Sequence, residues 1–441
     1  MTRSSWRIRG RRRCFIAGSA SILALTLCLA TFGSSSGASA GTAAPGGSSS
    51  TSAVLMAASV LGSPKPATGS PIKIGLFNAE GGSVLDLPNI GDSAVAAADY
   101  ANNYLGGLSG HRIEVVRCAD KVDGVSATNC GNQFASDGVA AVVIGLGAQT
   151  DMMIPPVKKA GIPYFGTGVN SPLETSTPGL FFLTAGITGD IAAMAGYSKE
   201  KGYKKVAILT LQNPQALNTI NLLKPKFASR GITVSETIVP QGTPDATPQV
   251  TAGLANKPDA VVVIADPTTC QSLFAGLQTA GFTGGKMIID ACLSSSMIQA
   301  IGSSGINGTA VFSGTATYAP GNESNLYNAV MSKYYPSDSK VGATYNGYVS
   351  MLGLIRAVNA SGTKSVPTPS TIQSALKSSK NVPEPLGNGK TFGCGVSALA
   401  GNSVVKSTIC SPYIFVSKMK GTNYGTSYQS INLKTIFQSA G

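Results

Sequence analysis

From Pro71 onward, short apolar runs rich in β-branched residues alternate with longer stretches whose apolar residues recur at helical spacing. This alternation is typical of βαβ units, in which helices cover both faces of a parallel sheet. We therefore predict an α/β fold. The predicted strands are 72–77, 113–116, 139–145, 206–211, 233–239, 261–265 and 286–290, and the predicted helices are 90–105, 129–137, 152–160, 217–229 and 270–280.

The length of 441 residues exceeds that of one ordinary domain and suits two. The alternation begins again after Ile187, and segments starting at Ala140 and Asp259 share one order: buried strand, polar loop, helix, Ala-Gly turn, buried strand. Two similar α/β lobes explain this repeat. The alternative is that any two βαβ units share part of this order, since the Ala-Gly helix stop recurs in many α/β folds.

The first 40 residues have the features of an export signal. Six arginines precede a mostly apolar, uncharged run over 15–32, and Ala38-Ser39-Ala40 supplies a small-residue cleavage site. We predict a signal peptide over 1–40, and Arg12-Arg13 also resembles the twin-arginine export pattern. A membrane anchor is the alternative, because the apolar run has borderline length. Residues 41–70 are rich in Gly, Ser, Ala, Thr and Pro and are predicted to form a flexible stalk before an exported body.

Charge and composition exclude several classes of function. The formal net charge is +13, but six of the 33 basic residues lie in the predicted signal, so a nucleic-acid-binding surface is not expected. The single histidine, His111, leaves no basis for His-dependent catalysis or His-rich metal sites. We expect no cofactor and no metal.

Six cysteines follow the predicted signal, and they occur as sequence neighbours. In an exported chain, an even and locally paired set indicates disulfides, although buried free thiols are the alternative. The predicted pairs are Cys118–Cys130, Cys270–Cys292 and Cys394–Cys410.

Three short motifs match catalytic or nucleotide-binding patterns by accident. The Gly145-Leu146-Gly147 string lacks the third glycine of a dinucleotide loop. The G-x-S-x-G string at 33–37 lies in the predicted signal, and the S-x-x-K string at 374–377 lacks the companion motifs of penicillin-recognising enzymes. No catalytic constellation remains.

Open parallel sheets bind ligands outside the carboxyl ends of their strands. The loops after Phe77, Gly145, Phe165, Leu211, Ala265 and Asp290 are therefore the expected ligand site. Backbone N–H groups at helix starts there favour a carboxylate or another small anion.

Several strings in order resemble the type I periplasmic binding proteins of the leucine/isoleucine/valine-binding family, the solute receptors of ABC importers. They include PIKIGLFNAEGG from Pro71, VAAVVIGLGAQTDMMIPPVKKAGIPYFGTGVNSP from Val139, and then GYKKVAILT, AGFTGGKMIID and TYNGYVSMLGLIRAV. The resemblance covers about 71–441 and implies two Rossmann-like lobes with parallel sheets, joined by a three-strand hinge. We expect lobe 1 to contain 71–187 plus 316–392 and lobe 2 to contain 188–315 plus 393–441.

The resemblance also implies where a ligand binds. Loops 147–150 and 168–170 would hold the ligand's carboxylate through backbone donors, and Asp290, beside Ala291, is the nearest acid for an ammonium group. A helix-capping or loop role is the alternative for Asp290. The candidate ligand-binding residues are Gly147, Ala148, Gln149, Thr150, Gly168, Val169, Asn170, Gln215, Asp266 and Asp290.

The predicted function is that of a monomeric exported receptor that presents a small carboxylate-bearing ligand, such as an amino acid, amide or organic acid, to an ABC permease. Two alternatives remain open. One is a secreted hydrolase that works with carboxylates alone, which requires two facing carboxyl groups in one cleft. The other is a cell-surface sensor or interaction protein on the same fold.

Overall fold

A computed structural model describes residues 59–438 except 84 and 339, and it describes Pro214 and Gln215 by their backbone alone. The predicted signal peptide lies outside these residues, as does the predicted stalk up to residue 58. The remaining stalk residues contact the body: Leu61 is buried, and the Lys65 and Ala67 N–H groups donate to Asn103 and Asn102 carbonyls. No helix among the described residues is both long and apolar enough to cross a bilayer.

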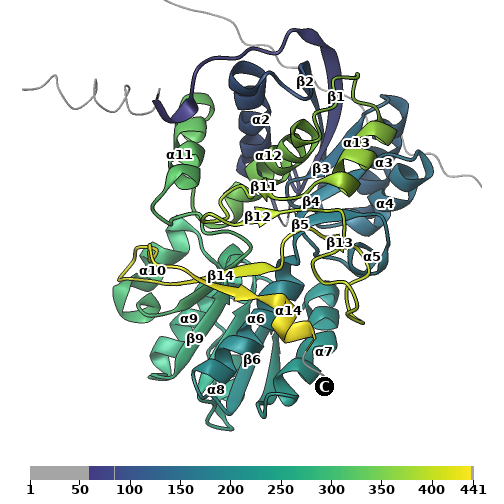
Figure 1. Ribbon diagram of the computed structural model, residues 1–441. Coiled ribbons are helices and arrows are strands. Elements are labelled where there is room, and N and C mark those ends of the chain that lie inside the picture. The colour runs from purple at the N-terminus through teal and green to yellow at the C-terminus, as the bar shows by residue number, and fades with distance from the viewer. Residues whose placement is uncertain (1–58, 84, 339, 439–441) are drawn as a thin grey trace, which may run out of the picture. The chain divides into compact units, whose positions relative to one another are not determined.

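Two sheets form the frame of the described chain (Figure 1). The first sheet has the strand order β13-β5-β4-β3-β1-β2, and every neighbouring pair is parallel. Its strands are β1 (Gly69–Asn78), β2 (His111–Ala119), β3 (Ala141–Ile144), β4 (Tyr164–Gly168), β5 (Phe181–Thr184) and β13 (Thr408–Ile409).

The second sheet has the order β15-β14-β10-β9-β8-β6-β7, in which β14 and β15 are antiparallel to their neighbours and the other pairs are parallel. Its strands are β6 (Lys205–Leu211), β7 (Thr233–Val239), β8 (Ala260–Ile264), β9 (Gly285–Ile289), β10 (Ala310–Ser313), β14 (Tyr413–Lys418) and β15 (Gln429–Asn432). A separate hairpin pairs β11 (Val382–Pro383) with β12 (Thr391–Phe392).

Helices cover both faces of the first sheet, as the alternating pattern predicts. Ile74 and Leu76 of β1 share a core with α2 and α12, whereas Phe77 belongs to a core with α3 and α4. The helices around this sheet are α2 (Pro88–Tyr100), α3 (Gly124–Ser136), α4 (Thr150–Lys159), α5 (Pro172–Ser176), α11 (Asn322–Tyr334), α12 (Tyr345–Ala360) and α13 (Pro369–Ser378). The predicted helix over 90–105 is α2 followed by a π-helix, η1 (Ala101–Leu105), which ends at Gly106 with a φ of 75°.

The helices of the second sheet form two packed groups: α6 contacts α7 and α14, and α9 contacts α8 and α10. Their bounds are α6 (Gly186–Glu200), α7 (Pro214–Ala228), α8 (Thr247–Leu254), α9 (Pro267–Thr279), α10 (Ser295–Ile306) and α14 (Leu433–Phe437). Two short 3-10 turns, η2 (Asp290–Cys292) and η3 (Gly342–Thr344), complete the described elements.

The chain passes between the two sheets three times: between β5 and α6, between β10 and α11, and between β13 and β14. The predicted α/β fold with two lobes and a three-strand hinge is therefore confirmed. At the last crossing Ser411 donates its hydroxyl to the buried Glu384 carboxylate at 2.9 Å, and burial raises the pKa of Glu384 to about 8.

One segment joins a different sheet from the expected one. We assigned 393–441 to lobe 2, but β13 pairs with β5 in the first sheet, and the chain enters the second sheet only at β14. Cys394 and Cys410 also pack within the first sheet's core, which ties this segment to lobe 1.

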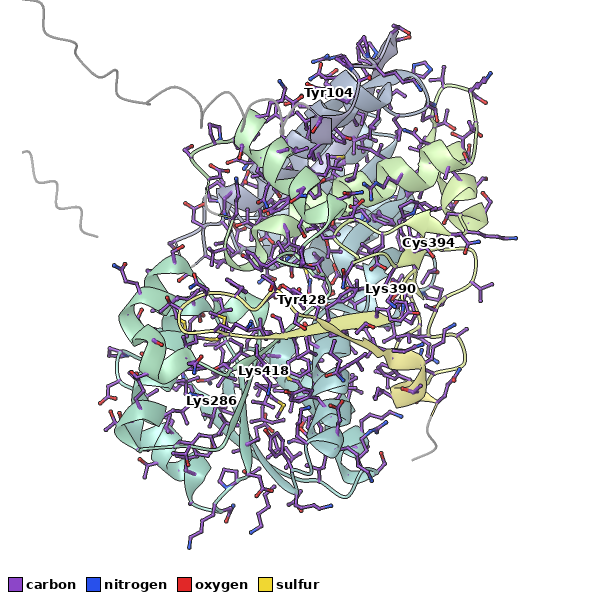
Figure 2. The ribbon with its side chains drawn as sticks, turned by 60° about the vertical axis from the view of Figure 1, so that its left-hand side comes forward. Tyr104, Lys286, Lys390, Cys394, Lys418 and Tyr428 are labelled. Carbon is purple, nitrogen blue, oxygen red and sulfur yellow. A yellow bond between two sulfur atoms is a disulfide. The ribbon has the colours of Figure 1, made fainter. Side chains whose placement is uncertain are left out.

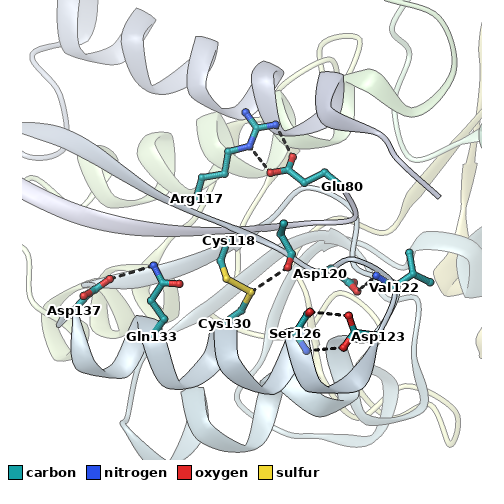
Figure 3. The surroundings of a disulfide bond; sticks show 11 residues. Glu80, Arg117, Cys118, Asp120, Val122, Asp123, Ser126, Cys130, Gln133 and Asp137 are labelled. Carbon is teal, nitrogen blue, oxygen red and sulfur yellow. Dashed lines mark hydrogen bonds and ion pairs between the residues drawn. A yellow bond between two sulfur atoms is a disulfide. The ribbon is translucent and has the colours of Figure 1, made fainter. Parts of the chain in front are cut away.

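All three predicted disulfides are present, with sequence separations of 12, 22 and 16. Cys118–Cys130 joins the end of β2 to α3 (Figure 3). Cys270–Cys292 joins α9 to η2, so it connects two loops at the carboxyl ends of β8 and β9.

Candidate functional site

A cavity of about 300 Å³ lies where the carboxyl ends of strands from both sheets meet. The last residues of β3, β4 and β5 line it from the first sheet, and those of β6, β8 and β9 line it from the second. The first turns of α6 and α12 complete the wall. This position at the strand ends is where open α/β sheets bind ligands.

Asp120, directly after β2, supports the cavity wall from behind. It is fully buried, and its carboxylate accepts hydrogen bonds from the backbone N–H groups of Ala148 at 2.6 Å, Gln149 at 2.9 Å and Val122 at 2.9 Å. Burial raises the pKa of Asp120, and the N–H donors oppose this rise. Figure 3 shows Asp120 beside the Cys118–Cys130 disulfide.

Glu174 has the same role for the second loop of this wall. It is fully buried in α5 and accepts the N–H groups of Asn170 at 2.7 Å and Ser171 at 3.1 Å, together with the Tyr164 hydroxyl. Burial raises the pKa of Glu174 to about 7, against the effect of these donors. Each loop of the first-lobe wall is thus held by a buried acid of the protein itself.

The structure brings together many of the sequence-predicted residues of these loops. Gly147, Ala148, Gln149, Gly168 and Asn170 line the cavity. Their expected role was to donate backbone N–H groups to a ligand carboxylate, but the N–H groups at 148, 149 and 170 donate to Asp120 and Glu174. Thr150 and Val169 are fully buried and are not among the lining residues.

The glycines of these loops are required by the packing of the protein itself. A Cβ added at Gly147 would lie 2.1 Å from Cγ2 of Thr150, and one at Gly168 would lie 2.3 Å from Cα of Gly186. Real Cβ atoms do not approach other atoms this closely. Larger residues at Gly147 and Gly168 would therefore disturb the fold whether or not a ligand touches them.

Asp290 lies on the second-lobe wall, at the start of η2 directly after β9. Its Oδ2 atom accepts a hydrogen bond from the Ser313 hydroxyl at 2.8 Å and another from the Tyr345 hydroxyl. Burial raises the pKa of Asp290 to about 6, and the bond from Ser313 opposes this rise. Tyr345 and Ala291 line the same cavity beside it.

Asp190 is a second acid on this wall, and the sequence analysis did not identify it. It lies in α6 with 6% of its surface exposed, and its buried Oδ1 atom has no hydrogen-bond partner among the described residues. Burial raises the pKa of Asp190 well above its ordinary value, and the negative charge of Asp290 raises it further. The available signal was a lone acid in an otherwise apolar stretch, Gly186–Tyr197.

Two other predicted residues take different positions. Asp266 does not line the cavity; its carboxylate caps α9 by accepting the N–H groups of Thr268 at 3.0 Å and Thr269 at 3.1 Å. The Gln215 side chain lies outside the described part, whereas its neighbour Ala216 lines the cavity.

Basic residues are absent from the described cavity wall. None of its lining residues is Lys, Arg or His. Lys286 and Lys418 belong to β9 and β14 of the second lobe but are not among these residues (Figure 2). Within the described chain, no three His, Cys, Asp or Glu residues are placed to hold a metal ion.

Comparison with known proteins identifies the family to which the sequence is similar. The sequence profile of the periplasmic binding protein family matches residues 71–402. No curated protein matches the sequence.

Solved structures share the fold at low sequence identity. A leucine binding protein, LivK, from Thermotoga maritima is 17% identical with a TM-score of 0.66, over 82% of this chain and 99% of its own. The branched-chain amino acid binding protein LivJ from Streptococcus pneumoniae, in complex with isoleucine, is 19% identical with a TM-score of 0.65, over 82% and 99%. A fatty acid ABC transporter substrate-binding protein from Thermomonospora curvata is 16% identical with a TM-score of 0.65, over 84% and 94%.

Proposed function

Because the chain belongs to the periplasmic binding protein family, we propose that it is an exported receptor that delivers a small organic solute to an ABC permease. The observation that carries this proposal is the cavity of about 300 Å³ lined by the strand ends of both sheets. Closure of two lobes around such a cavity excludes water and strengthens its polar contacts. We propose that the receptor acts as a monomer, with no cofactor and no nucleic acid.

We propose that the solute carries an amino group, because the cavity offers an acid to bind it. Asp290 supplies a partly exposed carboxylate in the cavity, and an ammonium group is its natural partner. Apolar side chains such as Ile144, Leu211 and Ile264 line other parts of the cavity and suit a hydrocarbon body. Two similar structures are named for leucine or bound isoleucine and a third for a fatty acid, so amino acids and fatty acids are the first solutes to test.

A thermal-shift screen of the purified chain tests the receptor function. Amino acids, amides, urea, aromatic acids and fatty acids are added one at a time to the exported form. A ligand at a hundredfold over its Kd stabilises the folded state by about 2.7 kcal/mol, which is readily measured as a rise in Tm. A chain that no solute stabilises would contradict the proposal.

The hydrolase alternative now has one supporting observation, since Asp190 and Asp290 line one cavity. Glycoside hydrolysis needs one carboxylic acid and one carboxylate on opposite sides of the scissile bond. Both aspartates belong to the second-lobe wall, which does not suit that arrangement. We expect no product from aryl glycosides, and turnover that Asp290→Asn abolishes would favour the enzyme.

A further inference from the structure

The two acids of the second-lobe wall have no cationic partner among the described residues that line the cavity. Asp190 and Asp290 are the charged residues among its described lining residues. Because burial opposes their ionisation, both carry a desolvation penalty that a cationic ligand would relieve.

The buried Oδ1 atom of Asp190 is an independent sign of a missing partner. Buried polar atoms in folded proteins are nearly always hydrogen-bonded, and an isolated one costs free energy. Asp190 is more than nine-tenths buried and faces the cavity, yet this oxygen has no partner among the described residues. A ligand N–H group would satisfy it.

Five donors of the opposite wall are already used within the protein. The backbone N–H groups of Ala148, Gln149 and Asn170 donate to buried acids of the protein. The hydroxyl groups of Thr167 and Thr184 donate to the backbone carbonyls of other residues. A ligand carboxylate needs donors, whereas these N–H and hydroxyl groups already donate within the protein, and only the two hydroxyl oxygens can still accept a hydrogen bond.

We propose that the solute is a small primary amine without a carboxylate group, and that its ammonium lies between Asp190 and Asp290. This inference rests on the proposed receptor function and narrows its ligand class. The three N–H donors of a primary ammonium suit Oδ1 of Asp190 and the Asp290 carboxylate together. The hydrocarbon body of the amine contacts the apolar wall formed by residues such as Ile187 and Ile289.

Calorimetry with matched pairs tests this ligand class. Each pair is an amino acid and the amine that remains when its carboxylate is removed: leucine with isoamylamine, valine with isobutylamine, phenylalanine with phenethylamine, and lysine with cadaverine. We expect the amine of at least one pair to bind at least tenfold more tightly than its amino acid. If the amino acid binds more tightly, the amine inference fails and the receptor function stands; if no solute of any class binds, both fail.

Variants test the place of the ammonium. Asp190→Asn preserves the shape of the side chain, and we expect it to weaken binding of the best amine at least thirtyfold, as should Asp290→Asn. The matched control is Glu236→Gln, a partly buried acid of β7 that pairs with Lys224, does not line the cavity and should leave the Kd unchanged. Unfolding midpoints establish that each variant is folded. Unchanged amine binding by folded Asp190→Asn would overturn the proposal.

Discussion

The acids of the two cavity walls differ in what they bind. In the first-lobe wall, Asp120 and Glu174 accept backbone N–H groups of their own loops. In the second-lobe wall, Asp290 takes two hydroxyl groups on one oxygen, and Asp190 keeps a buried oxygen without a partner among the described residues. The acids of the first wall therefore have their hydrogen-bond partners within the protein, whereas Asp190 of the second wall lacks one for its Oδ1 atom among the described residues. An acidic side chain in a cavity wall can thus either stabilise a loop or bind a ligand. Its hydrogen-bond partners within the protein distinguish the two roles.

The largest expected effect is on stability, from removal of the acid that holds the first wall. Asp120→Ala leaves three backbone N–H groups without an acceptor, and we expect it to lower the free energy of unfolding by about 4 kcal/mol. Asp266→Ala is the matched control on the second lobe, since it removes only a helix cap at a cost of about 1 kcal/mol. Denaturant unfolding measures both values. Equal losses would mean that Asp120 does not hold the loop.

The disulfide of the second lobe should affect both stability and binding. Replacing Cys270 and Cys292 by alanine opens a loop with a sequence separation of 22, and chain entropy predicts a loss of about 3 kcal/mol. Cys292 is two residues after Asp290, so the same variant should weaken ligand binding. The comparison pair, Cys118 and Cys130, lies beside Asp120 on the first wall, and it should lose similar stability with a smaller change in Kd. Binding that responds equally to both pairs would contradict the assignment of specificity to the second wall.

A smaller effect concerns the pH dependence of stability. The pKa of Glu384 rises on folding from its ordinary value of 4.5 to about 8, so the folded state binds more protons than the unfolded state between these values. Stability therefore falls as pH rises, and this group contributes a loss of about 2 kcal/mol between pH 5 and pH 7. We expect Glu384→Gln to remove that part of the slope in urea titrations. An unchanged slope would show that Glu384 is ionised in the folded protein.

The smallest expected effect is that of Asp290→Asn on the ligand-free protein. Because burial raises the pKa of Asp290 to about 6, its ionised form destabilises the fold above that pH. The facing groups are Asp190 and the tyrosines at 318, 345, 424 and 428, so no cation in the described part of the chain is seen to offset this cost. Because solvent screens this partly exposed side chain, we expect a gain in stability of only about 1 kcal/mol at pH 7.5, and none at pH 4. A loss at both pH values would show that Asp290 has a structural role.

The fold could be predicted from the sequence because the patterns that indicate it lie within short segments of the chain. The alternation of strands and helices, and the spacing of the six cysteines, do not depend on which distant residues meet. The predicted start of α3 at 129 is too late, because the helix begins at Gly124, where the carboxylate of Asp123 caps it by accepting the Ser126 N–H group. The cap at Asp266 was also visible locally, since Pro267 at the first helical position follows an acid.

The site was harder to predict because it depends on contacts between distant segments. The hydrogen bonds to Asp120 come from residues 28 and 29 positions away, and no local sequence pattern predicts them. Asp190 becomes a buried acid only because α6 follows a crossing between the sheets and meets η2 at the cavity. Asp290 could be named because it ends a predicted strand, and parallel sheets bind ligands at the strand ends.

The bonds from Asp120 to the loop at 148 and 149 also have an evolutionary consequence. The loop's donors are backbone groups, so its shape does not depend on which side chains stand at Ala148 and Gln149. Substitutions at these two positions should accumulate freely among relatives, whereas Asp120 should change only together with the loop's length. Selection on the shape of this loop would then be seen as conservation of Asp120, 28 residues before Ala148.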